Sequence, residues 1–149
     1  MNPVWPLPGA RECVDQLGRA GRTLGLVSNA QFFTMDLLRL LLPGPGGSAW
    51  FTDDLRFLSY QQGRAKPSTY LFELAGQALE RRGIACNEVL YVGNDMLNDI
   101  WPASSCGFRT ALFAGDARNL RWRSEEPRVR GLEPDLVVTE LIDVIHCIF

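Results

Sequence analysis

Residues 89–99 read Val-Leu-Tyr-Val-Gly-Asn-Asp-Met-Leu-Asn-Asp. The first four are apolar and are β-branched or aromatic at three positions, which is typical of a buried strand. Gly93 ends that strand, and the acids Asp95 and Asp99 follow it. Carboxylates at the carboxyl end of a strand in an open α/β sheet lie where such sheets bind ligands, and hard oxygen ligands suit Mg²⁺. The plainer alternative is a polar loop in which Asn98 or Asp99 caps the next helix.

Composition restricts the classes of protein to which the chain can belong. Its 149 residues are enough for one domain, residues 1–149, with its own core. The net charge of -2 and the lack of a long basic run give no case for a nucleic-acid partner. No apolar run approaches the length of a membrane span, and the N-terminus does not follow the plan of a signal peptide. We therefore expect neither nucleic-acid binding nor membrane association.

The cysteines argue for a reduced environment. Cys13, Cys86, Cys106 and Cys147 are far apart with no Cys-x-x-Cys pair, and His146 is the only histidine. This pattern opposes both a zinc site and a disulfide framework. A cytoplasmic location is the simplest expectation.

Apolar periodicity and helix-breaking residues predict alternating strands and helices along the chain. The arginine-rich segment 116–134 is expected to be a long surface loop or a frayed helix. The alternation predicts an α/β fold with a parallel sheet and right-handed crossovers. Strands are expected over 23–27, 57–60, 89–92, 110–114 and 136–138, and helices over 9–20, 32–42, 68–82, 99–106 and 140–149.

Three polar positions fall at or just after the ends of successive predicted strands: Ser28, Lys66 and the pair Asp95 and Asp99. A hydroxyl that donates to a phosphate oxygen, an ammonium that neutralises charge and a carboxylate-bound metal would together make a phosphate site. Lys66 is the only lysine among 15 basic residues. That favours a position where the wider fork of arginine does not fit, over a solvated surface lysine.

The order of these motifs resembles that of the haloacid dehalogenase-like (HAD) hydrolase superfamily. The resemblance rests on Leu-Val-Ser-Asn at 26–29, Lys-Pro at 66–67, Val-Gly-Asn-Asp-Met-Leu-Asn-Asp-Ile at 92–100 and the stretch 103–110, and it covers nearly the whole chain. It implies a Rossmann-like parallel sheet with helices on both faces. It also implies Mg²⁺-dependent phosphoryl transfer, most often hydrolysis of a small phosphomonoester.

The resemblance assigns roles residue by residue. Ser28 matches the phosphate-binding hydroxyl of the second motif, with Asn29 beside it. Lys66 matches the third-motif lysine that steadies the phosphate and the aspartyl intermediate. The fourth-motif Mg²⁺ ligands are expected among Asn94, Asp95 and Asp99.

Asn94 departs from the family pattern, because many members carry the first metal acid at that place. Which of Asp95 and Asp99 touches the metal directly is therefore left open.

The first motif of the family, a strand ending in Asp-x-Asp, has no counterpart. Glu12 and Asp15 lie on the first predicted helix, and Asp53 and Asp54 precede a strand instead of ending one. Covalent catalysis by a carboxylate therefore has no visible nucleophile. We expect a C-terminal portion of a HAD hydrolase, without its first central strand and cap and inactive by itself.

Two classes of function remain open. One is a phosphatase whose site is completed by a complementing N-terminal chain, and the other is a non-catalytic HAD-like remnant that binds a partner. A flavodoxin-like or receiver-like domain ranks last. In the family the absent strand lies between those that end here at Ser28 and Gly93, so these two either pair directly or receive a strand from another chain. Unpaired edges of this kind predict marginal stability or self-association.

Overall fold

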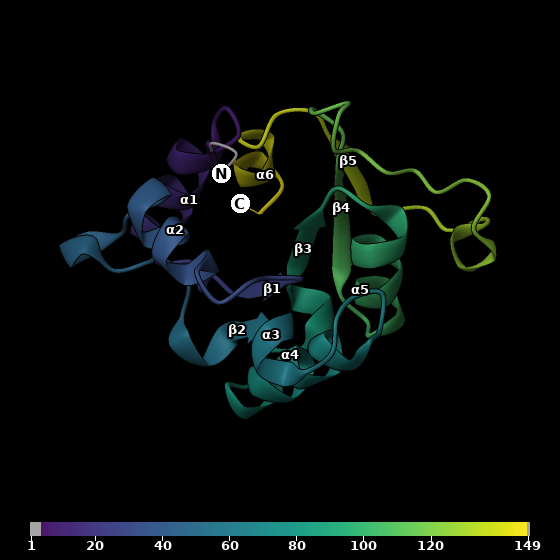
Figure 1. The fold of residues 1–149 in the computed structure, drawn as a ribbon, viewed down its shortest axis with the longest axis horizontal. Coiled ribbons are helices and arrows are strands. Elements are labelled where there is room, and N and C mark those ends of the chain that lie inside the picture. The colour runs from purple at the N-terminus through teal and green to yellow at the C-terminus, as the bar shows by residue number, and fades with distance from the viewer. Residues whose placement is uncertain (1–3, 149) are drawn as a thin grey trace.

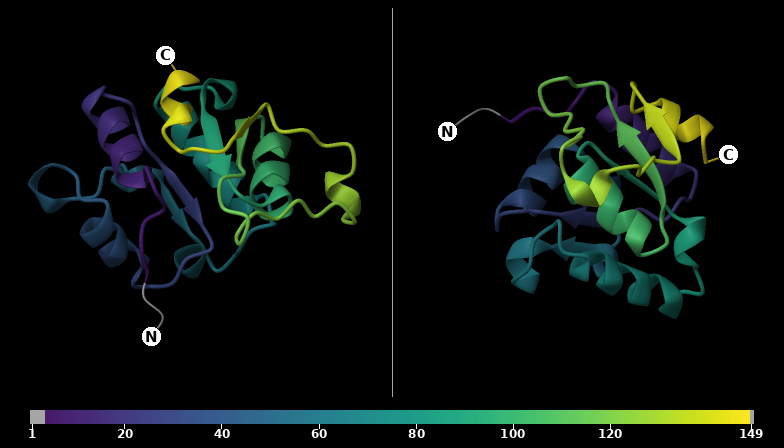
Figure 2. Two further views of the ribbon diagram at one scale, coloured as in Figure 1. Left: turned by 90° about the horizontal axis from the view of Figure 1, so that it is seen from above. Right: turned by 90° about the vertical axis from the view of Figure 1, so that its right-hand side faces the viewer.

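Two short parallel sheets and the helices around them make up the fold (Figures 1 and 2). The structure is a computed structural model, and it describes residues 4–148. All strand pairs are parallel, which confirms the α/β class. One sheet pairs β1 (Leu26–Ser28) with β2 (Arg56–Leu58), and the other has the order β3-β4-β5 (Leu90–Gly93, Arg109–Phe113, Leu136–Val138).

The parallel sheet is interrupted between β1 and β3. Of the two arrangements expected for strands that lack their central neighbour, direct pairing of β1 with β3 is wrong. β1 pairs with β2 alone and β3 with β4 alone within the described residues. Each of the two strands therefore keeps one unpaired edge.

Helices cover both faces of these sheets, as expected for a Rossmann-like fold (Figure 1). α4 packs on β1 and β2, α5 packs on β4, and α1 and α6 lie together on the opposite side. None of the helices between residues 4 and 148 has the length and apolar character that a membrane crossing requires. The bounds are α1 Ala10–Arg19, α2 Thr34–Leu41, α3 Ser59–Gln62, α4 Tyr70–Arg81, α5 Trp101–Ser105 and α6 Asp143–His146.

The core is divided between the two faces of the sheets. Phe72 of α4 is fully buried and meets Tyr91 and Phe108 edge to face. On the opposite face, Leu17 of α1 and Val144 of α6 belong to a second apolar cluster. A third cluster lies under the loop that follows β4.

Several predicted elements differ in extent from the observed ones. Residues 59–60, predicted as strand, begin the short helix α3. α4 begins at Tyr70 instead of residue 68, because residues 65–68 form a turn in which the Ser68 N–H donates to the Ala65 carbonyl. The segment Met96–Ile100 is already a π-helical turn before α5. The last helix is one turn, and Phe149 lies outside the described residues.

Candidate functional site

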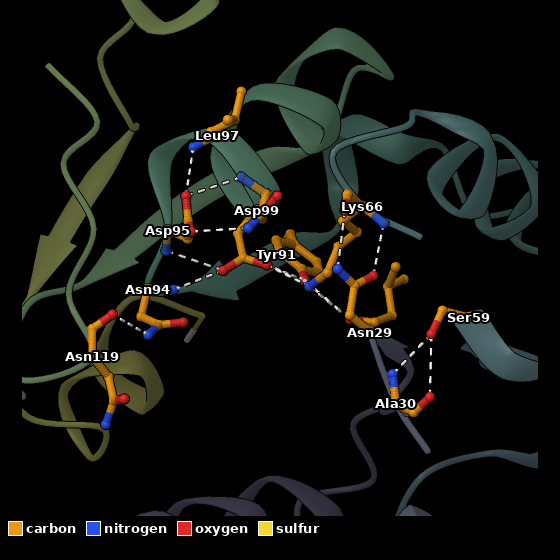
Figure 3. A network of polar contacts seen from close by, with 12 residues as sticks. Asn29, Ala30, Ser59, Lys66, Tyr91, Asn94, Asp95, Leu97, Asp99 and Asn119 are labelled. Atoms are coloured by element: carbon orange, nitrogen blue, oxygen red, sulfur yellow. Dashed lines mark hydrogen bonds and ion pairs between the residues drawn. The ribbon is translucent and has the colours of Figure 1, made fainter. Parts of the chain in front are cut away.

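Lys66 is held in place by the loop that follows β1 (Figure 3). The Asn29 side chain accepts a bond from the Lys66 backbone N–H at 2.7 Å and donates to the Lys66 carbonyl at 3.0 Å. Both polar atoms of Asn29 are thus used on the backbone of Lys66. Asn29, expected beside a phosphate, acts in this structure as a positioning residue for the lysine.

The Lys66 ammonium lies between the two sheets, where it joins three groups. Its Nζ is 2.5 Å from Asp99 Oδ1, 3.0 Å from the Tyr91 hydroxyl and 3.3 Å from the Val27 carbonyl (Figure 3). The side chains of Lys66 and Asp99 are only 10% and 7% exposed. This is a buried ion pair, so removing either partner leaves an uncompensated charge.

Tyr91 is a member of this network that the sequence did not reveal. Its hydroxyl accepts from Lys66 Nζ, and it lies 3.1 Å from Asp99 Oδ1 and 3.2 Å from the Val27 carbonyl, either of which can take its proton. Burial first, and then the Asp99 carboxylate, raise the pKa of Tyr91 well above its ordinary value. The phenol therefore stays protonated. The one available signal was a polar-tipped aromatic residue inside an otherwise aliphatic strand.

Asp99 also fixes the turn after β3. Its Oδ2 accepts from the backbone N–H groups of Asn94 and Asp95, each at 3.0 Å. The turn closes tightly, because a β-carbon added at Gly93 would lie 2.3 Å from Asp99 Cβ. One side chain thereby links the end of β3 to the lysine that follows α3.

Asp95 has a different task, since it caps the turn that leads into α5. It accepts from the backbone N–H of Leu97 at 2.9 Å and of Asn98 at 3.1 Å. The expected cap at Asn98 or Asp99 is therefore wrong. The helical turn already begins at Met96, so its N-cap is the preceding residue in extended conformation, Asp95.

The loop after β4 lies across the same turn. Arg123 binds Asp95 through Nη2 at 2.7 Å and Nε at 3.2 Å, and Asn94 donates from its side chain to the Asn119 carbonyl at 2.7 Å. The Arg121 N–H and carbonyl bond the backbone on either side of Asp95. Arg123 has a φ of 55°, a left-handed conformation that a bulky residue keeps only where its surroundings hold it.

Ser28 ends β1 with its hydroxyl available. Among the described residues no protein group bonds that hydroxyl, and Ser28 is half-buried. The loop that follows is fixed separately, since the Ser59 hydroxyl accepts from the Ala30 N–H at 3.0 Å and donates to the Ala30 carbonyl at 3.2 Å. Ser28 is thus the group at this edge with capacity to donate to a ligand oxygen.

The acids do not present an open metal site in this arrangement. Each carboxylate oxygen of Asp95 and Asp99 already accepts from protein donors. Among the residues between 4 and 148 no group of three or more His, Cys, Asp or Glu side chains could hold a metal ion. Mg²⁺ prefers oxygen ligands in octahedral geometry. To bind here it would need an Asp95 oxygen that Arg123 has released, or ligands from elsewhere.

The structure brings together most of the residues singled out in the sequence. Lys66 and Asp99 are in direct contact, and Asn29 adjoins them. Asp95 instead faces Arg123. No sequence signal marks that pair, because the arginine belongs to an irregular loop with several similar arginines.

Because of the ion pair between Asp95 and Arg123, the free energy of unfolding should depend on pH in the acid range. Burial acts to raise the pKa of Asp95, but the guanidinium and the backbone N–H groups outweigh it and hold this pKa below its usual value. A lowered pKa gives stability that is present above the unfolded value near 4 and is lost as pH falls through the folded one. Arg123→Gln should therefore be less stable than wild type at pH 6, with the difference shrinking toward pH 3 in urea titrations.

Arg130→Gln is the matched control, because this arginine lies on the same loop and forms no ion pair with a carboxylate among residues 4–148. It should follow wild type at every pH. A constant deficit of Arg123→Gln down to pH 3 would contradict a charge-based role.

Comparisons with known proteins identify the fold. A scan of known protein families finds no match. The ribulose-1,5-bisphosphate 5-phosphatase of Halopiger xanaduensis is 30% identical over 109 residues, which cover 72% of this chain and 41% of that protein. The solved HAD phosphatase from Thermococcus onnurineus is 20% identical with a TM-score of 0.69, over 94% of this chain and 56% of that one.

A second solved structure, the HAD-hydrolase YfnB from Bacillus subtilis bound to magnesium, gives a TM-score of 0.72 at 20% identity. The match covers 95% of this chain and 54% of that chain. The chain thus spans about half the length of the solved structures it matches and 41% of the curated relative. Its fold is that of the haloacid dehalogenase-like hydrolases.

Proposed function

We propose that this chain provides the serine and lysine part of a HAD-type phosphomonoester hydrolase site, and that it lacks this activity by itself. The observation that carries the proposal is the Lys66 ammonium, fixed at the ends of β1 and β3 by Asp99 and Tyr91. The free hydroxyl of Ser28 offers a donor to the oxygens of a small phosphorylated substrate, and the ammonium, whose three N–H groups are engaged, offers its positive charge. The phosphatase relative supports a phosphomonoester as the substrate class.

The distribution of the other acids supports inactivity of the chain alone. Asp15 lies on α1 and pairs with Arg19 at 2.6 Å, and Asp54 precedes β2 and pairs with Arg82 at 2.6 Å. Both are engaged away from Lys66. Neither is therefore placed to act as a nucleophilic carboxylate beside Lys66.

Mg²⁺ is the cofactor proposed for the completed site, with Asn94, Asp95 and Asp99 as the nearest oxygen donors. When bound, it would neutralise phosphate charge. Because Arg123 and the backbone engage these carboxylates now, we expect no stabilisation of the isolated chain by Mg²⁺. The ion pair between Arg123 and Asp95 occupies a carboxylate that the metal would need. It therefore also favours the alternative, a non-catalytic HAD-like module that binds a partner chain.

Phosphate release from an aryl phosphate, with and without Mg²⁺, tests the proposal. The purified chain should release no more phosphate than Lys66→Ala. Because that variant removes half of a buried pair, Ser28→Ala serves as a second reference that should fold like wild type, since its hydroxyl has no protein partner among the described residues. Release by wild type that disappears in Ser28→Ala would show an active chain and contradict the proposed inactivity.

A further inference from the structure

We infer that the Arg123 guanidinium takes the place of a divalent cation at Asp95, and that the segment 119–123, which carries it, is a strap that keeps metal ions from this carboxylate. The inference deepens the proposed function, from which it takes Mg²⁺ as the ion. It is tested by ion binding alone, so it holds or fails independently of phosphate release.

The first support is that the lone pairs of Asp95 are fully used. Its Oδ1 accepts from the backbone N–H groups of Leu97 and Asn98 and lies 3.2 Å from Arg123 Nε. Its Oδ2 accepts from the Asn98 side chain at 3.0 Å and from Arg123 Nη2 at 2.7 Å. A carboxylate offers about four lone-pair sites, and five donors point at these two oxygens. A metal ion can therefore bind here only after a donor leaves.

The donor that can leave is the guanidinium. The other donors to Asp95 belong to the turn that this carboxylate caps, whereas Arg123 comes from a loop 28 residues further along the chain. The Arg123 side chain is 40% exposed, so it can exchange its partner for water, while the Asp95 side chain is 10% exposed. A divalent ion beside the guanidinium would also meet like charge at contact distance. Guanidinium and metal are therefore alternative occupants.

The strap is tied to the turn after β3, so the fold itself brings the guanidinium to the carboxylate. The Arg121 N–H donates to the Asn94 carbonyl and the Met96 N–H donates to the Arg121 carbonyl, each at 2.9 Å. The Asn94 side chain donates to the Asn119 carbonyl at 2.7 Å (Figure 3). These bonds fix the backbone two residues before Arg123, whose left-handed φ of 55° then aims its side chain at the turn.

Little packing holds the strap against the core. Leu120 is partly buried on the third core cluster, but positions 121–125 are exposed. Trp122 is 52% exposed, and together with Met96 and Val137 it lines a cavity of about 500 Å³. Segments with few buried apolar contacts open locally at low cost in free energy. The strap can therefore release the carboxylate while the sheets stay folded.

Binding of Mn²⁺, followed by electron paramagnetic resonance of the free ion, tests this directly, because Mn²⁺ accepts the same oxygen ligands as Mg²⁺. Arg123→Gln should bind Mn²⁺ more tightly than wild type by about tenfold or more, since the ion no longer displaces two charge-assisted hydrogen bonds. Arg130→Gln removes the same charge from the same loop but breaks no ion pair among residues 4–148. It should bind Mn²⁺ like wild type.

Two further measurements show where the ion binds. Asp95→Asn, added to Arg123→Gln, should abolish the gain in affinity, because the released oxygens belong to that carboxylate. Ethylguanidinium chloride should displace Mn²⁺ from Arg123→Gln, because it supplies the fork that the variant lacks. Sodium chloride at the same ionic strength should displace less, since it only screens charge.

Each contrary outcome overturns the inference. Equal Mn²⁺ affinity of wild type and Arg123→Gln, whether both bind or neither does, would show that the guanidinium excludes no ion. A gain of the same size in Arg130→Gln would assign the effect to the net charge of the loop, and a gain that survives Asp95→Asn would place the ion elsewhere.

Arg123→Lys keeps the question open to test if Arg123→Gln does not fold. Lysine retains one positive charge but lacks the fork that engages both oxygens of Asp95. It should therefore bind Mn²⁺ more tightly than wild type, and an unchanged affinity would refute the strap. Phosphate release by the wild-type chain would contradict its proposed inactivity without altering any of these ion-binding results.

Discussion

Lys66→Met is expected to lower the free energy of unfolding by about 3–5 kcal/mol, the usual effect of breaking a buried ion pair from one side. The methionine replaces the aliphatic stem but leaves the Asp99 carboxylate, 7% exposed, without its cation. The Tyr91 hydroxyl and the Val27 carbonyl lose a shared donor at the same time. Urea unfolding followed by far-ultraviolet circular dichroism measures the change.

Two further variants separate charge from packing. Lys66→Met combined with Asp99→Asn removes both charges, so its deficit should be smaller than the sum of the two single deficits. Arg82→Met breaks the exposed pair with Asp54 and should change stability little. A Lys66→Met variant as stable as Arg82→Met would show that the buried pair contributes nothing.

The sequence pattern correctly predicted those helices and strands whose conformation depends mainly on their own residues. The residues 136–138 form β5 as expected, and α1 agrees with its prediction within one residue at each end. The errors fall where tertiary contacts decide. Residues 59–60 continue the strand predicted over 57–60, but Ser59 turns its hydroxyl to the backbone of Ala30 and the chain enters α3.

The candidate site was likewise predictable only where a residue's role follows from its position next to a predicted strand. Ser28, Lys66 and Asp99 stand out because each lies at or soon after the end of a predicted strand, and strand ends are visible in the sequence. The role of Tyr91 depends on which face of β3 meets α4, and the pairing of Asp95 depends on the course of a loop about 28 residues later. Neither distance along the chain nor residue type contains that information.

Gly93→Ala is expected to destabilise the chain by about 3 kcal/mol, at the upper end of the usual cost of overpacking. The new methyl group would lie 2.3 Å from Asp99 Cβ and 2.5 Å from its Cγ. Asp99 has little freedom to move, since Lys66 and two backbone N–H groups bind it. The clash must therefore displace the carboxylate from the lysine or open the turn after β3, and thermal unfolding reports either.

Gly76→Ala is the matched control. Its added carbon would lie 3.2 Å from the Cys86 sulfur, a side-chain atom that can shift, and alanine favours the α4 helix by about 1 kcal/mol. It should be neutral or stabilising. The effects of Gly93→Ala and Lys66→Met should not add, because both act through the position of Asp99. Full additivity would mean that the glycine supports the strand alone, and that the tight turn after β3 is not what places the carboxylate beside the lysine.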